Sequence, residues 1–187
     1  MKIGQTPSQT VGPFFAFGLH ERQDMAGEAA LGQRIRILGN VYDGDGAPIV
    51  DALVELWQAD AQGIYNHPED PRQAEADPNF HGFGRSGTVH GGFVFKTIKP
   101  GAVPAPAGGQ QAPHIFVRVF SRGMLIHANS RLYFSDEPAN AHDSVLATVP
   151  EERRHTLIAQ LQPGQDLPTY KFDIFLQGED ETVFFEP

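Results

Sequence analysis

Histidine and tyrosine are the residues that could do metal chemistry in this sequence, which has eight histidines, four tyrosines and no cysteine. Two histidines at positions i and i+2 of a strand point the same way and can chelate one metal ion. Residues 114–120 read as such a strand, but Phe116 stands two positions after His114 and has no donor atom. No other H-x-H pair and no H-x-x-x-H pair occurs. The pattern therefore indicates half of a metal-binding pair.

The remaining motifs exclude several classes of protein. His67, His81 and His90 share one long connection, and their spacing fits no rigid element, which favours surface or loop-anchoring roles. G-x-S-x-G and P-loop motifs are absent, which argues against serine hydrolases and P-loop nucleotide-binding folds. Without cysteine there is no disulfide, thiolate metal site or thiol nucleophile. The net charge of −9 argues against nucleic acid or an anionic membrane as a partner.

The elements that must position these residues are mainly strands. Glycine (20) and proline (15) are spread along the chain, with short β-branched or aromatic runs between them. We expect a mainly β fold, a two-sheet β-sandwich with long loops and one short helix near residues 150–161. The expected strands are 34–42 and 52–58 as a hairpin, 93–97, 114–120, 124–127, 131–134, and a closing hairpin of 170–177 with 182–186.

The length of 187 residues predicts one domain. We expect residues 21–187 to form it, with residues 1–20 as an N-terminal arm at a partner interface, because Phe14, Phe15 and Phe17 need burial. The connection 59–90 has little periodicity, which is typical of functional or interface loops. No apolar run of about 18 residues occurs, and the start of the chain lacks the pattern of a signal peptide. These features predict a cytoplasmic protein.

Six segments, in the same order along the chain, resemble the intradiol ring-cleavage dioxygenases. They are Thr6-Pro-Ser-Gln-Thr10-Val-Gly-Pro13, Leu56-Trp57-Gln58-Ala59-Asp60, Asp77-Pro-Asn-Phe80 leading to Phe83-Gly-Arg85, Thr97-Ile-Lys-Pro-Gly101, Ala112-Pro-His-Ile115 and Arg131-Leu-Tyr-Phe134. The resemblance runs from about residue 6 to the end of the chain and is weakest over 19–34. It implies the family's β-sandwich fold and oxygen chemistry on a catecholate.

The family holds a non-haem Fe(III) with two tyrosines and two histidines, hard donors that suit a hard cation. The resemblance places these ligands at Tyr65, Val103, His114 and Phe116. Valine and phenylalanine supply no donor, so we expect no iron and no catalytic residue in this chain. Tyr65 and His114 are then interpreted as polar residues packed in a filled cavity.

The missing ligands imply a division of labour between two homologous chains. The resemblance is to those members of the family that are built from an iron-bearing beta chain and an iron-free alpha chain, which forms one wall of the beta chain's site. The resemblance assigns substrate binding to Arg122, Thr10, Gly12 and Pro13. It implies a hetero-oligomer of alpha–beta units, with Fe(III) in the beta subunit, that converts protocatechuate and O₂ to 3-carboxy-cis,cis-muconate.

Two other hypotheses stay open. The chain could be an autonomous catechol-type dioxygenase that recruits other iron ligands from His67, His81 or His90. It could also be a non-enzymatic β-sandwich binding module. Arg85 and Arg131 are expected to pair with loop carboxylates, with a substrate role left open for either.

Overall fold

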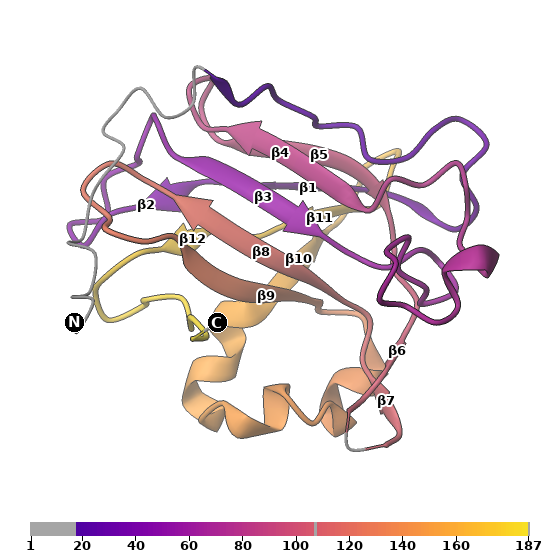
Figure 1. Ribbon diagram of the computed structural model, residues 1–187. Coiled ribbons are helices and arrows are strands. Elements are labelled where there is room, and N and C mark those ends of the chain that lie inside the picture. The colour runs from indigo at the N-terminus through magenta and orange to yellow at the C-terminus, as the bar shows by residue number, and fades with distance from the viewer. Residues whose placement is uncertain (1–17, 107, 187) are drawn as a thin grey trace, which may run out of the picture.

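The computed structural model describes residues 18–106 and 108–186, and its longer strands follow the alternation of apolar and polar residues (Figure 1). In β1 (Arg34–Gly39), Ile35 and Ile37 are fully buried while Arg34 and Arg36 are half-buried. β8 (His114–Phe120) buries Ile115, Val117 and Val119 on its inner face. Since strand side chains alternate between faces, each of these strands has one face for the core and one for ligands or solvent.

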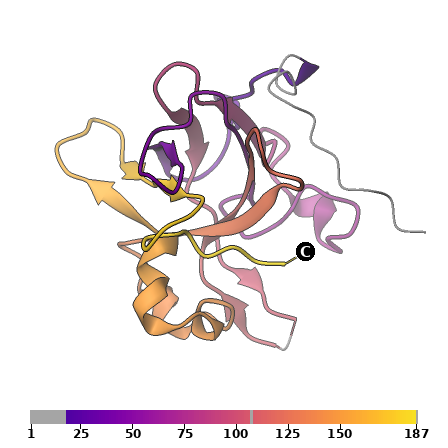
Figure 2. The ribbon, with the colours of Figure 1, turned by 90° about the vertical axis from the view of Figure 1, so that its left-hand side faces the viewer.

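Eight strands form one hydrogen-bonded sheet, which folds over on itself into two layers. The order is β4 (Phe83–Gly87), β3 (Leu53–Trp57), β8, β9 (Ala128–Phe134), β10 (Ile158–Gln162), β11 (Thr169–Lys171), β1 and β5 (Phe93–Ile98). The two terminal strands of this order meet across the core, where Val94 N donates to Ser86 Oγ at 3.2 Å. Figure 2 shows the resulting layers from the side. The predicted mainly β, sandwich-like fold is confirmed.

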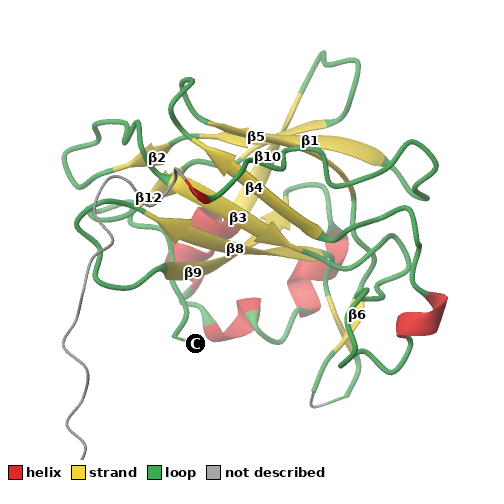
Figure 3. Ribbon diagram, turned by 45° about the horizontal axis from the view of Figure 1, so that its top comes forward, coloured by secondary structure: helices red, strands yellow, loops and turns green. Residues whose placement is uncertain are grey.

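Shorter elements complete the described chain. β2 (Val41–Tyr42) pairs with β12 (Ile174–Phe175), and β6 (Val103–Pro104) pairs with β7 (Gln110–Gln111). The 3-10 helices are η2 (Gln73–Glu75), η3 (Pro138–His142), η4 (Leu146–Thr148) and η5 (Glu151–Leu157). Figure 3 shows η3–η5 below the sheet and η2 in the long loop. No helix of the described residues is long and apolar enough to cross a membrane.

The main core lies between the layers, and a smaller one lies under the 3-10 helices. Phe95, Phe134 and Val117 belong to the main core, where a Cβ on Gly84 would meet Met25 Sδ at 2.7 Å. Glycine at this position therefore lets the β4 layer approach the β5 layer closely. The smaller cluster comprises Ala112, Tyr133, Leu146, Val149 and Leu157. It fixes the outer side of β9 next to the start of β8.

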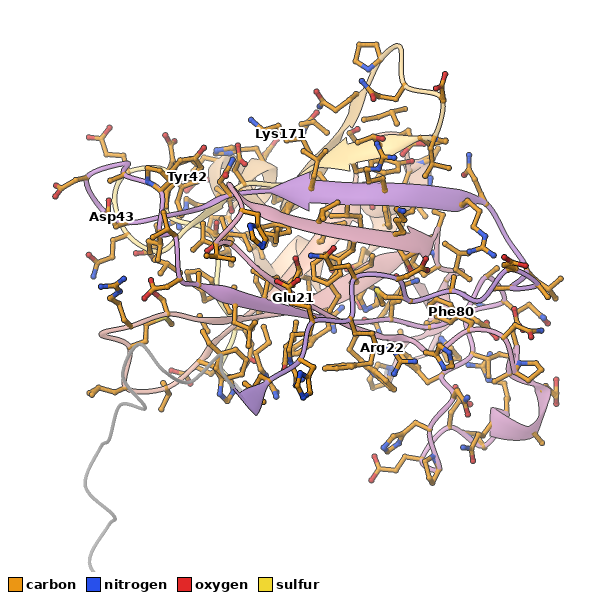
Figure 4. All side chains as sticks on the ribbon, turned by 90° about the horizontal axis from the view of Figure 1, so that it is seen from above. Glu21, Arg22, Tyr42, Asp43, Phe80 and Lys171 are labelled. Carbon is orange, nitrogen blue, oxygen red and sulfur yellow. The ribbon has the colours of Figure 1, made fainter. Side chains whose placement is uncertain are left out.

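The segment that follows the N-terminal residues closes the open edge of the sandwich. Arg22 N donates to Arg85 O of β4 at 2.7 Å, and Met25 N donates to Lys96 O of β5 at 2.9 Å. Glu21, Arg22 and Phe80 are labelled in the view from above (Figure 4). Residues 19–34 had no role from the sequence, and here they cover two edge strands. The expected arm, residues 1–20, lies almost entirely outside the described residues.

The predicted strand pairing was wrong in two places. The residues 34–42 and 52–58 do not form a hairpin, because β1 pairs with β5 and β11 while β3 pairs with β4 and β8. The turn at 43–46 is present, with Gly46 at φ 75°, but it leads the chain towards the other layer. At the C-terminal end, β12 pairs with β2 and Phe185 bridges Asn129, so 182–186 is not a hairpin strand. Alternation identifies a strand's buried face but not its neighbour.

Three element boundaries also differ from the prediction. Residues 124–127 are a loop, and the strand starts at Ala128, because the exposed pair Leu125 and Ile126 lacks any alternation. The connection 59–90 contains β4. The helix near 150–161 is a 3-10 helix that ends at Leu157, where Ile158 begins β10. A short apolar run of this kind fits both helix and strand periods.

Candidate functional site

The loop that carries Tyr65 is held by a buried carboxylate. Asp60 Oδ1 accepts hydrogen bonds from Gln62 N at 2.8 Å and Ile64 N at 3.0 Å, and Oδ2 accepts one from Asp77 N at 3.0 Å. Asp60 is 2% exposed. A buried carboxylate bonded to several backbone N–H groups fixes a turn, because each bond compensates the loss of water.

Two motifs of the sequence pack together and bring the Tyr65 loop to the Val103 strand. The buried amide of Gln58 donates to Ile98 O at 3.0 Å and accepts from Thr97 Oγ1 at 2.8 Å. Gly63 has φ 75°, and a Cβ there would lie 1.9 Å from Ala102 O. Only glycine permits this approach of the two loops. Tyr65 and Val103, 38 positions apart, therefore share one pocket.

His114 and Phe116 reach the same pocket from the outer face of β8. In the antiparallel register Phe116 lies between Trp57 of β3 and Arg131 of β9. Directly opposed residues place their side chains next to each other on the same face. An aromatic–aromatic–cation row therefore crosses this end of the sheet.

These elements enclose a surface-open pocket of about 540 Å³ at the end of the sheet where β3 finishes and β8 begins, on the right of Figure 1. All four ligand positions predicted from the resemblance line it, together with the row just described. Its lining includes Trp57, Tyr65, Val103, Gln111, His114, Phe116 and Arg131. The structure therefore brings the four assigned positions together, but around an open pocket and not in the filled cavity expected for Tyr65 and His114.

Burial and one cation set the charge state of this pocket. Burial lowers the pKa of His114 to about 4, and the charge of Arg131 acts in the same direction. His114 Nδ1 bonds to the carbonyl of Ala112 at 2.7 Å, and a carbonyl can only accept, so Nδ1 donates. Burial also raises the pKa of the Tyr65 phenol, although Arg131 opposes this shift. At neutral pH both side chains are uncharged. The charged residues of the pocket lining are Arg131, the Arg72–Asp70 ion pair and the exposed Glu69.

Comparisons with known proteins agree on the family. A family model described as "Dioxygenase" matches residues 15–178. The chain is 44% identical to the protocatechuate 3,4-dioxygenase alpha chain of Burkholderia cepacia over 98% of both chains, and 41% identical to that of Pseudomonas putida over 98% of this chain and 97% of the relative. It is 38% identical to the beta chain of Burkholderia cepacia, over 81% of this chain and 68% of the relative.

A solved structure agrees with the fold. The dioxygenase domain of a dioxygenase–carbohydrate-binding protein fusion from Streptomyces sp. SirexAA-E superposes with a TM-score of 0.63 at 25% identity, covering 94% of this chain and 99% of that one. The chain belongs to the intradiol ring-cleavage dioxygenase family. Within this family it is similar to alpha chains over nearly its whole length and to a beta chain over less of it, which confirms the prediction of an alpha-type dioxygenase subunit.

The residues of this intradiol dioxygenase chain do not fit the family's iron. Of the four ligand positions, Val103 and Phe116 carry no donor atom, and they occupy the wall on which two ligands would stand. Tyr65 and His114 are the remaining pair, and the Arg131 guanidinium adds a positive charge beside them. Two uncharged donors next to a cation are a poor set for Fe(III), which prefers several hard anionic ligands.

The other predicted site residues lie away from this pocket. At about 3.3 Å per strand residue, the two ends of β8 are roughly 20 Å apart. Arg122 follows the end opposite to His114. Its Nε donates to Asp51 Oδ2 at 2.5 Å, and its side chain is 60% exposed. Thr10, Gly12 and Pro13 lie outside the described residues.

The alternative ligands do not converge. His67 lines the pocket and packs edge-on against Trp57, whereas His81 and His90 are exposed and lie outside its lining. Within residues 18–106 and 108–186, no group of three or more histidine, aspartate or glutamate side chains is placed to hold a metal ion.

Sequence reasoning missed the polar residues that support the pocket. Asp143 is 1% exposed and accepts hydrogen bonds from Ala112 N, Tyr133 Oη, Val145 N and Leu146 N. It thus ties the chain just before His114 to the 3-10 helices. Arg85 pairs with Glu55, a strand carboxylate, at 2.6 Å. The expected carboxylate partner of Arg131 is not found among the described residues, where Gln111 Oε1 accepts from Arg131 Nη1 at 2.6 Å.

Proposed function

We propose that this chain is the iron-free alpha subunit of a protocatechuate 3,4-dioxygenase and forms part of the substrate pocket of a homologous beta subunit. In this proposal the beta subunit holds the Fe(III). The complex acts in the cytoplasm on protocatechuate and O₂ and releases 3-carboxy-cis,cis-muconate. The observation that carries the proposal is a ligand pocket that is assembled as in a family member but has lost two of its four donors.

Arg122 is the residue assigned to the substrate carboxylate. A guanidinium recognises a carboxylate through charge-assisted, often bidentate hydrogen bonds. Because Arg122 stands at the far end of β8 from His114, it does not serve this chain's own degenerate pocket. Its exposure supports a role towards a neighbouring chain.

The surroundings of Arg122 support a contact with a partner. Leu125 and Ile126, in the same β8–β9 loop, are 59% and 74% exposed. Large apolar side chains that stay exposed in one chain are often covered in an assembly. Arg122 also lines a second pocket, of about 460 Å³, together with Asp43, Ser121 and Met124. We place the N-terminal arm, with Thr10, Gly12 and Pro13, against the same partner surface.

Co-expression with a homologous chain that keeps Tyr, Tyr and H-x-H tests the proposal. We expect the two chains to purify together, iron to be present at one equivalent per pair, and oxygen uptake with protocatechuate to require both chains. The full chain alone should bind no stoichiometric Fe(III). Iron bound to the isolated chain with a visible tyrosinate band would support an autonomous dioxygenase instead. Failure to associate with any such partner would support a binding module.

A further inference from the structure

Arg131 is a cation without an anionic partner in its pocket. Its Nη1 donates to the neutral Gln111 Oε1, and the Tyr133 hydroxyl also lies beside the guanidinium. The other guanidinium in the pocket wall, Arg72, pairs with Asp70 at 3.1 Å. No ion pair of Arg131 occurs in the part of the chain that the structure describes. Guanidinium groups at ligand sites commonly keep such free donors for a carboxylate or phosphate.

The walls of the pocket suit a planar ring. Trp57 and Tyr65 stack at 14° with centroids 6.0 Å apart, and Phe116 stands beside Trp57 on the next strand. Aromatic side chains bind flat rings through large apolar faces at little conformational cost. The volume of about 540 Å³ is within the range of small-molecule sites.

Two polar groups in the pocket can meet a ring hydroxyl. The Tyr65 hydroxyl has no hydrogen bond to any described residue, whereas the backbone N of Tyr65 donates to Asp70 Oδ2 at 3.0 Å. His114 uses Nδ1 for Ala112 O, which leaves Nε2 as the free polar atom of the ring. A donor–acceptor hydroxyl on the ligand can bond to either group.

We propose that this pocket binds a hydroxylated aromatic monocarboxylate without a metal, with the carboxylate on Arg131 and the ring against Trp57 and Phe116. The loss of two metal ligands thus leaves a binding site in place of a catalytic one. The inference does not depend on a beta partner, because every group it uses belongs to this chain. It adds a second site for aromatic acids, at the opposite end of β8 from Arg122.

The test uses 4-hydroxybenzoate, which lacks the second hydroxyl of a catechol, and the full chain in the presence of a metal chelator. Trp57 is the one tryptophan of the sequence and lines the pocket, so its fluorescence reports binding there. We expect saturable binding, and Arg131→Gln should raise Kd roughly tenfold to a hundredfold, the usual worth of a hydrogen bond to a charged group. Arg36→Gln is the matched charge control, because Arg36 is a half-buried arginine on β1 in the other layer.

Further measurements separate the contribution of the carboxylate from that of the hydroxyl and control for misfolding of the variants. The neutral 4-hydroxybenzyl alcohol should bind wild type and Arg131→Gln equally weakly. Tyr65→Phe, which removes one oxygen, should weaken 4-hydroxybenzoate more than benzoate. If Arg131→Gln alters the circular dichroism of the isolated chain, equilibrium dialysis of the complex decides: wild type should bind one more equivalent of 4-hydroxybenzoate than the variant. Equal affinity in the Arg131 and Arg36 variants, or binding that the chelator abolishes, overturns the proposal.

Discussion

Replacing Arg122 by glutamine in the assembled enzyme is the sharpest perturbation of the proposed function. Arg122 holds an exposed ion pair with Asp51, whose side chain is 22% exposed. Such a pair is worth about 0.2–1 kcal/mol. A charge-assisted hydrogen bond to a desolvated substrate carboxylate is worth about 1.5–3 kcal/mol. The difference leaves about 1–2 kcal/mol for substrate capture, which corresponds to a fall in kcat/KM of roughly 5- to 30-fold.

Steady-state oxygen uptake by the co-purified complex measures this effect. The fall in kcat/KM should be seen with protocatechuate and be absent with catechol, which lacks the carboxylate, while the iron content stays unchanged. Asp51→Asn is the matched control, because it frees Arg122 and should leave kcat/KM for protocatechuate equal or higher. An Arg122→Gln complex with unchanged kcat/KM, or with the same loss for both substrates, would refute the role assigned to Arg122.

Three further predictions concern the pocket at the other end of β8. Asp143→Ala removes the acceptor of four hydrogen bonds and should lower the free energy of unfolding by at least roughly 3 kcal/mol in urea titrations; a loss below about 1.5 kcal/mol would contradict this. The pKa of His114 is about 4 in the folded chain and 6.5 in the unfolded chain. As the pH falls from 6.5 to 4, only the unfolded chain gains a proton at this residue, so the free energy of unfolding decreases. His114→Gln should remove up to about 3 kcal/mol of that loss between pH 7 and 4, measured by urea titration at each pH. The double variant Val103→Tyr with Phe116→His should bind Fe(III) and show a visible tyrosinate band that neither single variant shows, and a colourless, iron-free double variant would argue against the ligand positions assigned.

The strands that could be predicted are those with a regular alternation of buried and less buried residues in their own sequence. Ile35 and Ile37 alternate with arginines, and burial in β8 alternates from Ile115 to Phe120, so both strands follow from the local sequence. The pairing of β1 with β11 does not, because a parallel contact between residues more than 130 positions apart depends on how the layers close. The strand β10 was missed for a related reason: Ile158 follows a 3-10 turn without a break in apolar character.

The site shows the same division between local and long-range information. The absence of a donor at Val103 and Phe116 can be read from the sequence once the ligand positions are assigned. The support for those positions cannot, because Gln58 and Thr97 are 39 residues apart and Asp60 contacts Asp77 across a loop. Such bonds are made only after the chain has folded, when an unpaired buried amide or carboxylate would be costly.

The positive charge of Arg131 connects the missing metal ligands of this pocket with the anionic ligand that we propose for it. In a family member with all four donors, a metal cation organises this space; here Arg131 is the cation that remains, and it is bonded to a neutral amide. The attraction for an anion that we propose for this pocket therefore rests on Arg131, since the other guanidinium of the lining, Arg72, pairs with Asp70. The two ends of β8 can then be separated by experiment, because Arg131→Gln should act on the isolated chain and Arg122→Gln only on the complex. If Arg131→Gln has no effect on the isolated chain, the proposed role of Arg122 is not affected. If Arg122→Gln has no effect on the complex, the proposed ligand site at Arg131 is not affected.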